Sequence, residues 1–297
     1  MDWWDTNAGA IEKIWAMSFE LQKIIRLPYL KEMKKFFTDN SEKASVKILE
    51  IGCGTGWVCR MIADENFHVL GTDFSKGQLA IAISEAKIYN KEKYCTYELA
   101  DASSFPTDID GVVIHALLHH LSSQELVFFF EKLKKIPKTT KVFIYEPVFV
   151  QKTGAMPSLT DKLLHKIITG LKSFCLNLAN RKGIKDENLV ITMNKIYEDA
   201  KNNGWYISPK EVPFYEAELN NYLENDYTVR KRYIVNKTDF DIAQSLVINK
   251  IYKPGFLFSN VLIPFASWLD KLSFKGNYTF YIAPQTHLFT CFELVRK

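Results

Sequence analysis

The 297-residue sequence predicts an α/β fold, in which a doubly wound, mainly parallel sheet carries helices on both faces. Two observations support this prediction. Between Val46 and Pro147, short apolar runs alternate with helical patterns, which is the order that builds parallel sheets. Directly after the first run comes the turn Gly52-x-Gly54-x-Gly56. Glycines have no Cβ, so the backbone here can turn sharply and approach a ligand closely.

The core elements follow from hydrophobic periodicity and capping signals. We expect one or two helices over residues 6–37, with a break at Pro28. This segment could pack on the sheet edge, cover a ligand as a lid, or do both. Ser75 and Ser122 each stand three residues before a Gln or Glu, which is the spacing of a capping box. We expect strands at 46–51, 67–73, 94–100, 111–116 and 141–145, the last closed by Glu146-Pro147, with helices from 57, from 75 to about 90, and from 122 to about 135.

After Pro147 the regular alternation stops. Two further helices are expected, at 161–180 and at about 187–203, the second ended by Gly204. The core resumes at 208–214, with a helix at 216–224, a strand at 227–235 and a last, antiparallel strand at 286–296. The predicted organisation is a helical lid (1–45), a core (46–147), a helical insertion (148–214), a core continuation (215–236), an aromatic cap insertion (237–284) and a final strand (285–297). Both insertions follow strand ends that border the ligand crevice of such sheets, so we expect them to cap the substrate.

Composition sets broad limits on function. The net charge of +4 permits anionic partners but does not by itself indicate nucleic acid. The five cysteines show no metal-binding spacing, and the N-terminus lacks a signal-peptide pattern, so we expect free thiols and a cytoplasmic location.

The spacing of the glycine turn narrows the ligand class. The lysine of a P-loop is absent, and G-x-G-x-G differs from the G-x-G-x-x-G of dinucleotide folds. Glu50 ends the first strand, where an acid would repel a pyrophosphate and attract a cationic amino group. Asp73 and Asp101 end the next two strands. A ligand with an amino-acid end and a nucleoside end, S-adenosylmethionine, fits three acids at successive strand ends.

Residues 46–147 resemble the class I S-adenosylmethionine-dependent methyltransferases that act on small molecules and quinones, whose sheet is Rossmann-like and seven-stranded with the last strand antiparallel. The resemblance implies that Glu50 and the glycine turn hold the methionine part, and that Asp73 accepts hydrogen bonds from the ribose. Asp101 and Ala102 would contact the adenine. The implied cofactor-binding residues are Glu50, Gly52, Cys53, Gly54, Gly56, Asp73, Phe74, Gln78, Asp101, Ala102 and His115.

The loop 115–121 carries the candidates for acid–base chemistry. A hydroxyl acceptor must lose a proton on methylation, and His119 or His120 could take it, with Glu146 as a further candidate. Alternatively, the histidines pack or cap the next helix, and Glu146 orients a loop. The sequence shows no tight cluster of acids and histidines, so we expect no metal-assisted methylation. The sequence motifs of amino-methylating and cytosine-methylating DNA enzymes are absent, which disfavours a nucleic-acid substrate.

The uncharged run 255–269 leaves one alternative open. It is shorter than the roughly 20 residues of a membrane-spanning helix, and Pro264 interrupts it. The run could lie buried in the cap or rest at a membrane interface, next to Lys250, Lys253 and Lys271. The predicted function is methyl transfer to a small or lipid-linked acceptor at oxygen. The alternatives are a non-catalytic S-adenosylmethionine-binding or peripheral membrane protein and, less favoured, a nucleic-acid methyltransferase.

Overall fold

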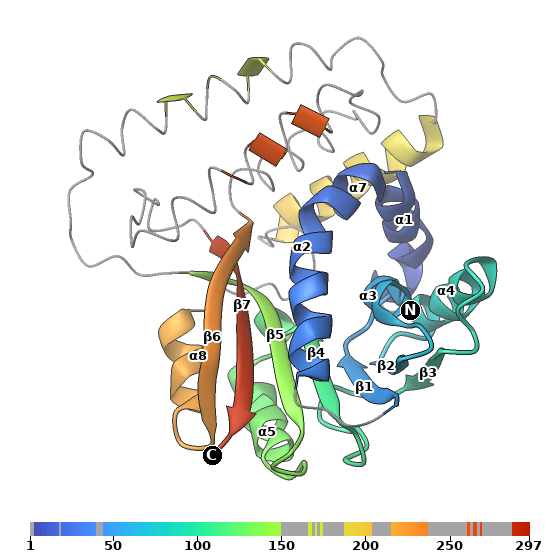
Figure 1. Ribbon diagram of the computed structural model, residues 1–297. Helices are drawn as coiled ribbons and strands as arrows, with labels where there is room; N and C mark the ends of the chain where they lie inside the picture. Colours follow the sequence, from blue (N-terminus) through green and yellow to red (C-terminus); the bar gives the residue numbers. More distant parts are fainter. Residues whose placement is uncertain are drawn as a thin grey trace.

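The computed structural model describes residues 3–17, 19–39, 44–149, 187–203, 215–236 and 287–297, with isolated positions within 166–174 and 260–268. The described chain forms a seven-stranded sheet in the order β3-β2-β1-β4-β5-β7-β6 (Figure 1). Strands β1 to β5 pair in parallel, and β7 is antiparallel to both of its neighbours. The predicted doubly wound sheet with an antiparallel last strand is therefore confirmed. The strands are β1 (Val46–Ile51), β2 (Phe67–Asp73), β3 (Cys95–Leu99), β4 (Gly111–His115), β5 (Lys141–Phe149), β6 (Tyr227–Asn236) and β7 (His287–Arg296).

Helices cover both faces of the sheet (Figure 1). α2 (Phe19–Thr38), α3 (Trp57–Ile62) and α4 (Lys76–Ile88) contribute to one hydrophobic cluster, and α5 (Ser123–Leu133) and α8 (Glu216–Leu223) to the other. α1 (Trp3–Met17) packs against α4 and also contacts α7 (Glu187–Asn203). A single 3-10 turn, η1 (Leu118–His120), follows β4.

The capping signals act as expected at two helix starts. The Ser75 hydroxyl accepts a hydrogen bond from the Gln78 amide at 3.1 Å, which begins α4. At α5 the box is reciprocal, because Ser122 accepts from the Glu125 amide and the Glu125 carboxylate accepts from the Ser122 amide. These local bonds satisfy amide groups that a helix start otherwise leaves without partners.

Two predicted boundaries were wrong. The break expected at Pro28 does not occur, because α2 runs through this residue. β5 continues through Glu146 and Pro147 to Phe149, because β7 supplies antiparallel partners beyond the last residue of β4. A proline is tolerated where pairing on one side of a strand has ended. α4 ends at Ile88, followed by Asn90 with a left-handed φ of 53°.

Several expectations fall wholly or mostly outside the described residues. These are the helix 161–180, the stop at Gly204, the core segment 208–214, and the aromatic run 255–269 with its insertion. The predicted elements at 187–203, 216–224 and 227–235 are described and are helix, helix and strand as expected. Among the described residues, no helix is both long and apolar enough to cross a bilayer.

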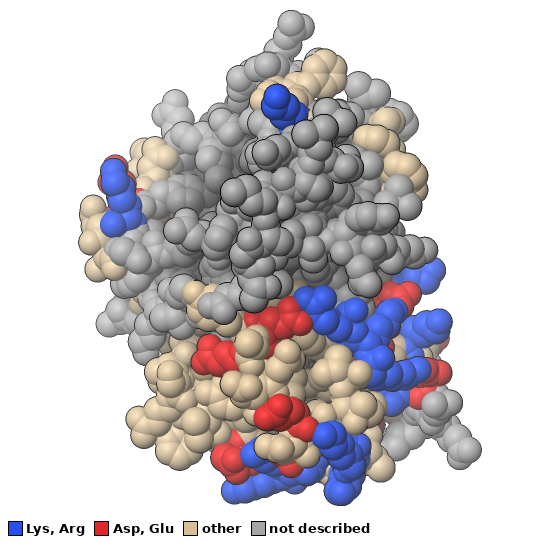
Figure 2. Space-filling model, turned by 90° about the vertical axis from the view of Figure 1, so that its left-hand side faces the viewer, with Lys and Arg blue, Asp and Glu red and all other residues tan. Residues whose placement is uncertain are grey.

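The basic run Arg230-Lys231-Arg232 lies on β6, the edge strand, and its side chains are exposed. Each pairs with an acid: Arg230 with Asp39, Lys231 with Glu32 at 2.6 Å, and Arg232 with Glu216. Figure 2 shows positive and negative side chains adjoining on this face. The run is therefore a solvated strand edge with its charges locally balanced.

Candidate functional site

The predicted site residues lie at the carboxyl edge of the sheet, around the turn after β1. Gly52, Gly54 and Gly56 all have positive φ, at 69°, 54° and 71°. Residues with a Cβ adopt this left-handed region at a cost, so the alternate glycines give the turn its shape. The turn is held to β2 because the Cys53 amide donates to the Thr72 carbonyl at 2.9 Å.

The three glycines face different surroundings. A Cβ at Gly52 would lie 2.7 Å from Leu117, in the loop after β4, and one at Gly56 would lie 2.6 Å from the Tyr97 hydroxyl. A Cβ at Gly54 would have only the Gln78 Oε1 nearby, at 3.7 Å. Gly56 is therefore crowded by the Tyr97 ring and Ala82, and Gly52 by the end of the Leu117 side chain, whereas a Cβ at Gly54 would make only an ordinary contact.

Asp73, at the end of β2, binds this turn directly. Its Oδ2 accepts from the Gly54 amide at 2.8 Å, and its Oδ1 accepts from the Ser75 amide at 2.9 Å. The side chain is 8% exposed. A carboxylate has about four acceptor positions and no donor when ionised, which suits it to accept hydrogen bonds from ligand hydroxyls.

Glu50 lies beneath the turn and is 2% exposed. Its Oε2 accepts a hydrogen bond from the Cys59 thiol of α3 at 2.8 Å. Burial raises the pKa of Glu50 to about 8, because desolvation disfavours the ionised carboxyl. A cationic group bound beside Glu50 would favour its ionised form.

The other predicted cofactor residues of the β2–β3 side are less uniform. Gln78 is buried at 3% exposure, and its Oε1 has no hydrogen-bond partner among the described residues. Because this oxygen points toward Gly54, it is a candidate acceptor for a ligand donor. Phe74 is 54% exposed at the site rim. Asp101 is exposed and accepts from the amide and the hydroxyl of Ser103 at 2.8 and 2.7 Å, with Ala102 half-buried beside it.

The loop after β4 is built on the carboxylate of Glu146, which is fully buried in β5. Its oxygens accept from the amides of Leu117, Leu118 and His119 at 3.1, 3.2 and 3.1 Å. The His119 Nδ1 forms a short hydrogen bond with the same carboxylate. Glu146 thus orients the loop and the His119 ring together, which is the orienting role that the sequence left open.

His120 lies next to His119, with 4.0 Å between ring centroids. On its other side the Trp4 ring of α1 meets it edge-on, at 5.4 Å and 87°. Ala116, which starts the loop, has a φ of 52°. Such strain at a residue with a Cβ persists only where the surroundings enforce it and is common at functional sites.

His115 is not at the glycine turn but in an aromatic stack below the loop. Its ring lies 4.4 Å from that of Tyr145, and its Nε2 is 2.9 Å from the Tyr29 hydroxyl of α2. Burial lowers the pKa of His115 well below its usual range, so the ring is neutral. Through these contacts, His115 holds α2 against the sheet.

Three residues before the sheet were not predicted to act at this site. The Asp5 Oδ1 accepts from the Ser75 hydroxyl at 2.6 Å and from the Gly77 amide at 2.8 Å. Glu12 forms a buried ion pair of 2.9 Å with Arg60 of α3. The guanidinium of Arg26 lies 4.4 Å from the Trp57 ring centroid, at the end of the glycine turn. The expected helix periodicity of 6–37 gave no signal for these polar contacts.

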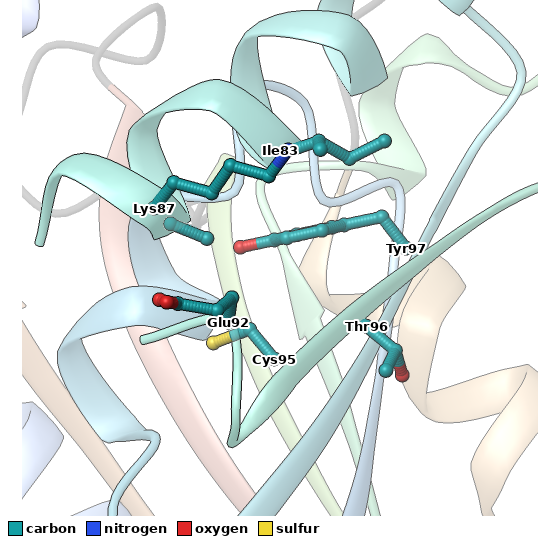
Figure 3. Close-up of a pocket in the computed structure, with 7 residues that line it drawn as sticks. Ile83, Lys87, Glu92, Cys95, Thr96 and Tyr97 are labelled. Atoms are coloured by element: carbon teal, nitrogen blue, oxygen red, sulfur yellow. The ribbon is translucent and has the colours of Figure 1, made fainter. Parts of the chain in front are cut away.

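A cavity of about 270 Å³ lies away from this edge, between α4 and β3. Figure 3 shows Ile83 and Lys87 of α4 on one side and Cys95, Thr96 and Tyr97 of β3 on the other, with Glu92 between them in sequence. The Tyr97 ring separates this cavity from Gly56, near which its hydroxyl ends. None of the residues that line this cavity belongs to the predicted site. In the described part of the chain, no cluster of three potential metal ligands occurs.

Comparisons with known proteins converge on one fold. Residues 48–139 match the family model described as a methyltransferase domain. A malonyl-[acyl-carrier protein] O-methyltransferase of Bacillus anthracis is 28% identical over 103 residues, covering 30% of this chain and 38% of the relative. The chain thus matches well under half of the length of this relative.

Solved structures extend the likeness beyond that segment. Magnesium protoporphyrin IX methyltransferase from Synechocystis PCC 6803, with bound S-adenosylhomocysteine, superposes with a TM-score of 0.51 at 13% identity, covering 98% of this chain and 95% of that one. The [4+2]-cyclase SpnF superposes with a TM-score of 0.50 at 13% identity, covering 90% and 80%. At such identities the likeness establishes the fold alone, and the reaction must be argued from the site.

Proposed function

We propose that this chain, which carries a methyltransferase domain over residues 48–139, is an S-adenosylmethionine-dependent methyltransferase that modifies a small or lipid-linked metabolite at oxygen. The observation that carries the proposal is the juxtaposition, at one sheet edge, of the clasped glycine turn and the buried His119–Glu146 pair. The cyclase neighbour shows that the fold alone would not suffice.

The residues at the turn fit the cofactor. The uncrowded Gly54, the Gln78 oxygen that lacks a described partner, and the Asp73 carboxylate would offer polar groups to the ligand on one side. Glu50 would face the amino group, and Asp73 the ribose hydroxyls. Asp101, Ala102 and Phe74 would lie at the adenine end. Cys53 contributes its backbone to the turn, and we assign His115 to the support of the site.

When bound, the cofactor supplies a methyl group on a sulfonium, already a good electrophile. What remains for the protein is to align the acceptor and remove its proton. With Glu146 accepting from the Nδ1–H of His119, Nε2 would be the nitrogen that takes the proton of the acceptor hydroxyl. His120, at 4.0 Å from His119, would line the same space.

A curated relative, the surface charges and the two insertions bear on the class of the methyl acceptor. The curated relative is named as an O-methyltransferase of a malonyl group on a carrier protein, which favours oxygen as the acceptor atom. On the β6 face shown in Figure 2, Arg230, Lys231 and Arg232 are each paired with an acid, which does not favour a nucleic-acid acceptor. A cap formed by the two insertions would close an apolar acceptor space, and their residues lie mostly outside the described chain.

Calorimetry with S-adenosylhomocysteine tests the cofactor assignment. We expect binding by the wild type and a loss of at least tenfold for Asp73→Ala; absence of wild-type binding would refute the proposal. Production of S-adenosylhomocysteine across hydroxyl and carboxyl acceptors then tests turnover. Vesicle flotation in parallel tests the peripheral-membrane alternative. His119→Ala should abolish turnover of a hydroxyl acceptor while leaving the affinity for S-adenosylhomocysteine intact, and an unchanged rate would remove His119 as the base.

A further inference from the structure

The first turn of α1 is anchored on the cofactor side of the site. The Asp5 carboxylate accepts from the hydroxyl of Ser75 and the amide of Gly77, and these bonds lower the pKa of Asp5. A Cβ at Gly77 would lie 2.8 Å from the Cα of Asp5. The helix therefore sits against α4 at a place where only glycine leaves enough room.

The neighbouring residue, Trp4, reaches the opposite side of the site. Its ring meets His120 edge-on at 5.4 Å, His120 lies 4.0 Å from His119, and His119 is bonded to Glu146. Edge-on aromatic contacts of this kind contribute about 0.5–1.5 kcal/mol beyond area burial and fix the angle between the rings. Two adjacent residues of one helical turn thus contact both halves of the site.

A continuous series of contacts joins the glycine turn to the two histidines. The Gly54 amide bonds to Asp73, Asp73 bonds to the Ser75 amide, and the Ser75 hydroxyl bonds to Asp5. From Asp5 the path continues through Trp4 to His120 and His119. The Asp73–Ser75 segment, which would contact the cofactor ribose, is thus joined to the histidines through the first turn of α1.

We propose that Trp4 is a positioning residue for His120 and His119, and that Asp5 sets Trp4 in place from the cofactor side. This inference rests on the proposed function, because it assigns a purpose to the histidines that the function requires. Trp4 meets the site at the His120 ring, so it acts through His120. α1 is then part of the acceptor side and not only a cover.

The test uses the full chain with ¹⁵N-labelled histidine, and S-adenosylhomocysteine as the probe. In Trp4→Ala we expect the ring ¹⁵N chemical shifts of His119 and His120 to change. Those of His68, a β2 residue whose ring contacts Tyr94, should stay in place. Trp4→Phe should restore the shifts of His119 and His120, since it keeps an aromatic ring. The affinity for S-adenosylhomocysteine should stay within about twofold in Trp4→Ala and fall about tenfold in Asp5→Asn, which should also move the His120 signal.

Gly9→Ala is the matched control on the same helix, because nothing lies within 4 Å of its added Cβ. It should leave all ring signals unchanged. Wild-type ring signals for His119 and His120 in Trp4→Ala would overturn the inference, as would an equal shift of His68. If the wild type fails to bind S-adenosylhomocysteine, the proposed function falls, while the ring comparison in the unliganded protein still decides the role of Trp4.

Discussion

The backbone amide of Gly54 donates to the Asp73 carboxylate over 2.8 Å, so the end of β2 clasps the glycine turn that follows β1. The same carboxylate accepts from the Ser75 amide at 2.9 Å, where the α4 segment begins. One buried side chain therefore fixes the relative position of two loops that are far apart in sequence.

Asp73→Ala should leave these two amides without their acceptor. We expect the free energy of unfolding to fall by about 1–3 kcal/mol, as for a buried donor left unsatisfied. Asp73→Asn should cost less, because its amide oxygen still accepts one bond. Asp101→Ala is the control, since its exposed carboxylate bonds only to nearby Ser103, and its change should stay within about 0.5 kcal/mol. Urea denaturation measures all three, and wild-type stability in Asp73→Ala would contradict the clasp.

The glycines of the turn should respond differently to alanine. Gly54→Ala costs about 1–2 kcal/mol for a left-handed residue with a Cβ and meets no clash. Gly56→Ala adds contacts of 2.6 Å to the Tyr97 hydroxyl and 2.9 Å to Ala82, so its loss of stability should be clearly larger. Ligand binding should follow the opposite order among folded variants, because the Gly54 methyl enters the ligand space. Equal stability of the two variants would contradict this assignment.

Stability should depend on pH through Glu50. Burial raises the pKa of Glu50 from 4.5 to about 8, so the folded state holds this proton more tightly than the unfolded chain. The stability that this group contributes is complete below pH 4.5 and is lost as the pH rises toward about 8. Glu50→Gln should remove that loss, so its unfolding free energy relative to wild type should rise steadily across this window, by up to about 1.4 kcal/mol per pH unit.

Chemical denaturation at four pH values between 5.5 and 8.5 measures this difference, with the exposed Glu98→Gln as the control. A difference between Glu50→Gln and wild type that does not change with pH would place the titrating proton elsewhere.

The fold was predictable because its signals are local. The β-branched run ending at Glu50, the alternate glycines and the capping box at Ser122 each specify their own element, and parallel strand order brings Asp73 to the glycine turn. The helix break predicted at Pro28 is absent, because the packing around this residue outweighs the preference of a proline. Tyr29, Leu30 and Met33 just beyond it are buried against the sheet, and this tertiary burial outweighs the cost of the proline.

The cross-chain contacts of the site were not predictable from spacing. Asp5 lies 70 residues before Ser75, and Trp4 is separated from His120 by most of the core, so no periodicity connects them. Glu146 was identified as a strand-end acid, but its pairing with His119 depends on β7 extending β5 beyond the end of β4. A site formed by side chains from separate elements can be predicted only once the arrangement of those elements is known.

Glu146 and His119 should differ sharply when substituted, although they bond to each other. Glu146→Ala removes the acceptor of three backbone amides and of the His119 ring, and should cost at least about 3 kcal/mol of unfolding free energy. His119→Ala leaves the carboxylate with its three amide donors, so it should cost less. Glu146→Gln keeps one acceptor oxygen and should fall between them.

Turnover of a hydroxyl acceptor separates orientation from proton transfer. If His119 takes the proton, His119→Ala should be inactive while folded, and Glu146→Gln should retain partial activity because the ring is present but less well oriented. If Glu146 were itself the base, Glu146→Gln would be inactive and His119→Ala would keep a measurable rate. The full burial of the carboxylate, which already accepts from three amides and one ring, favours the first result, because an acceptor hydroxyl cannot reach it without displacing His119.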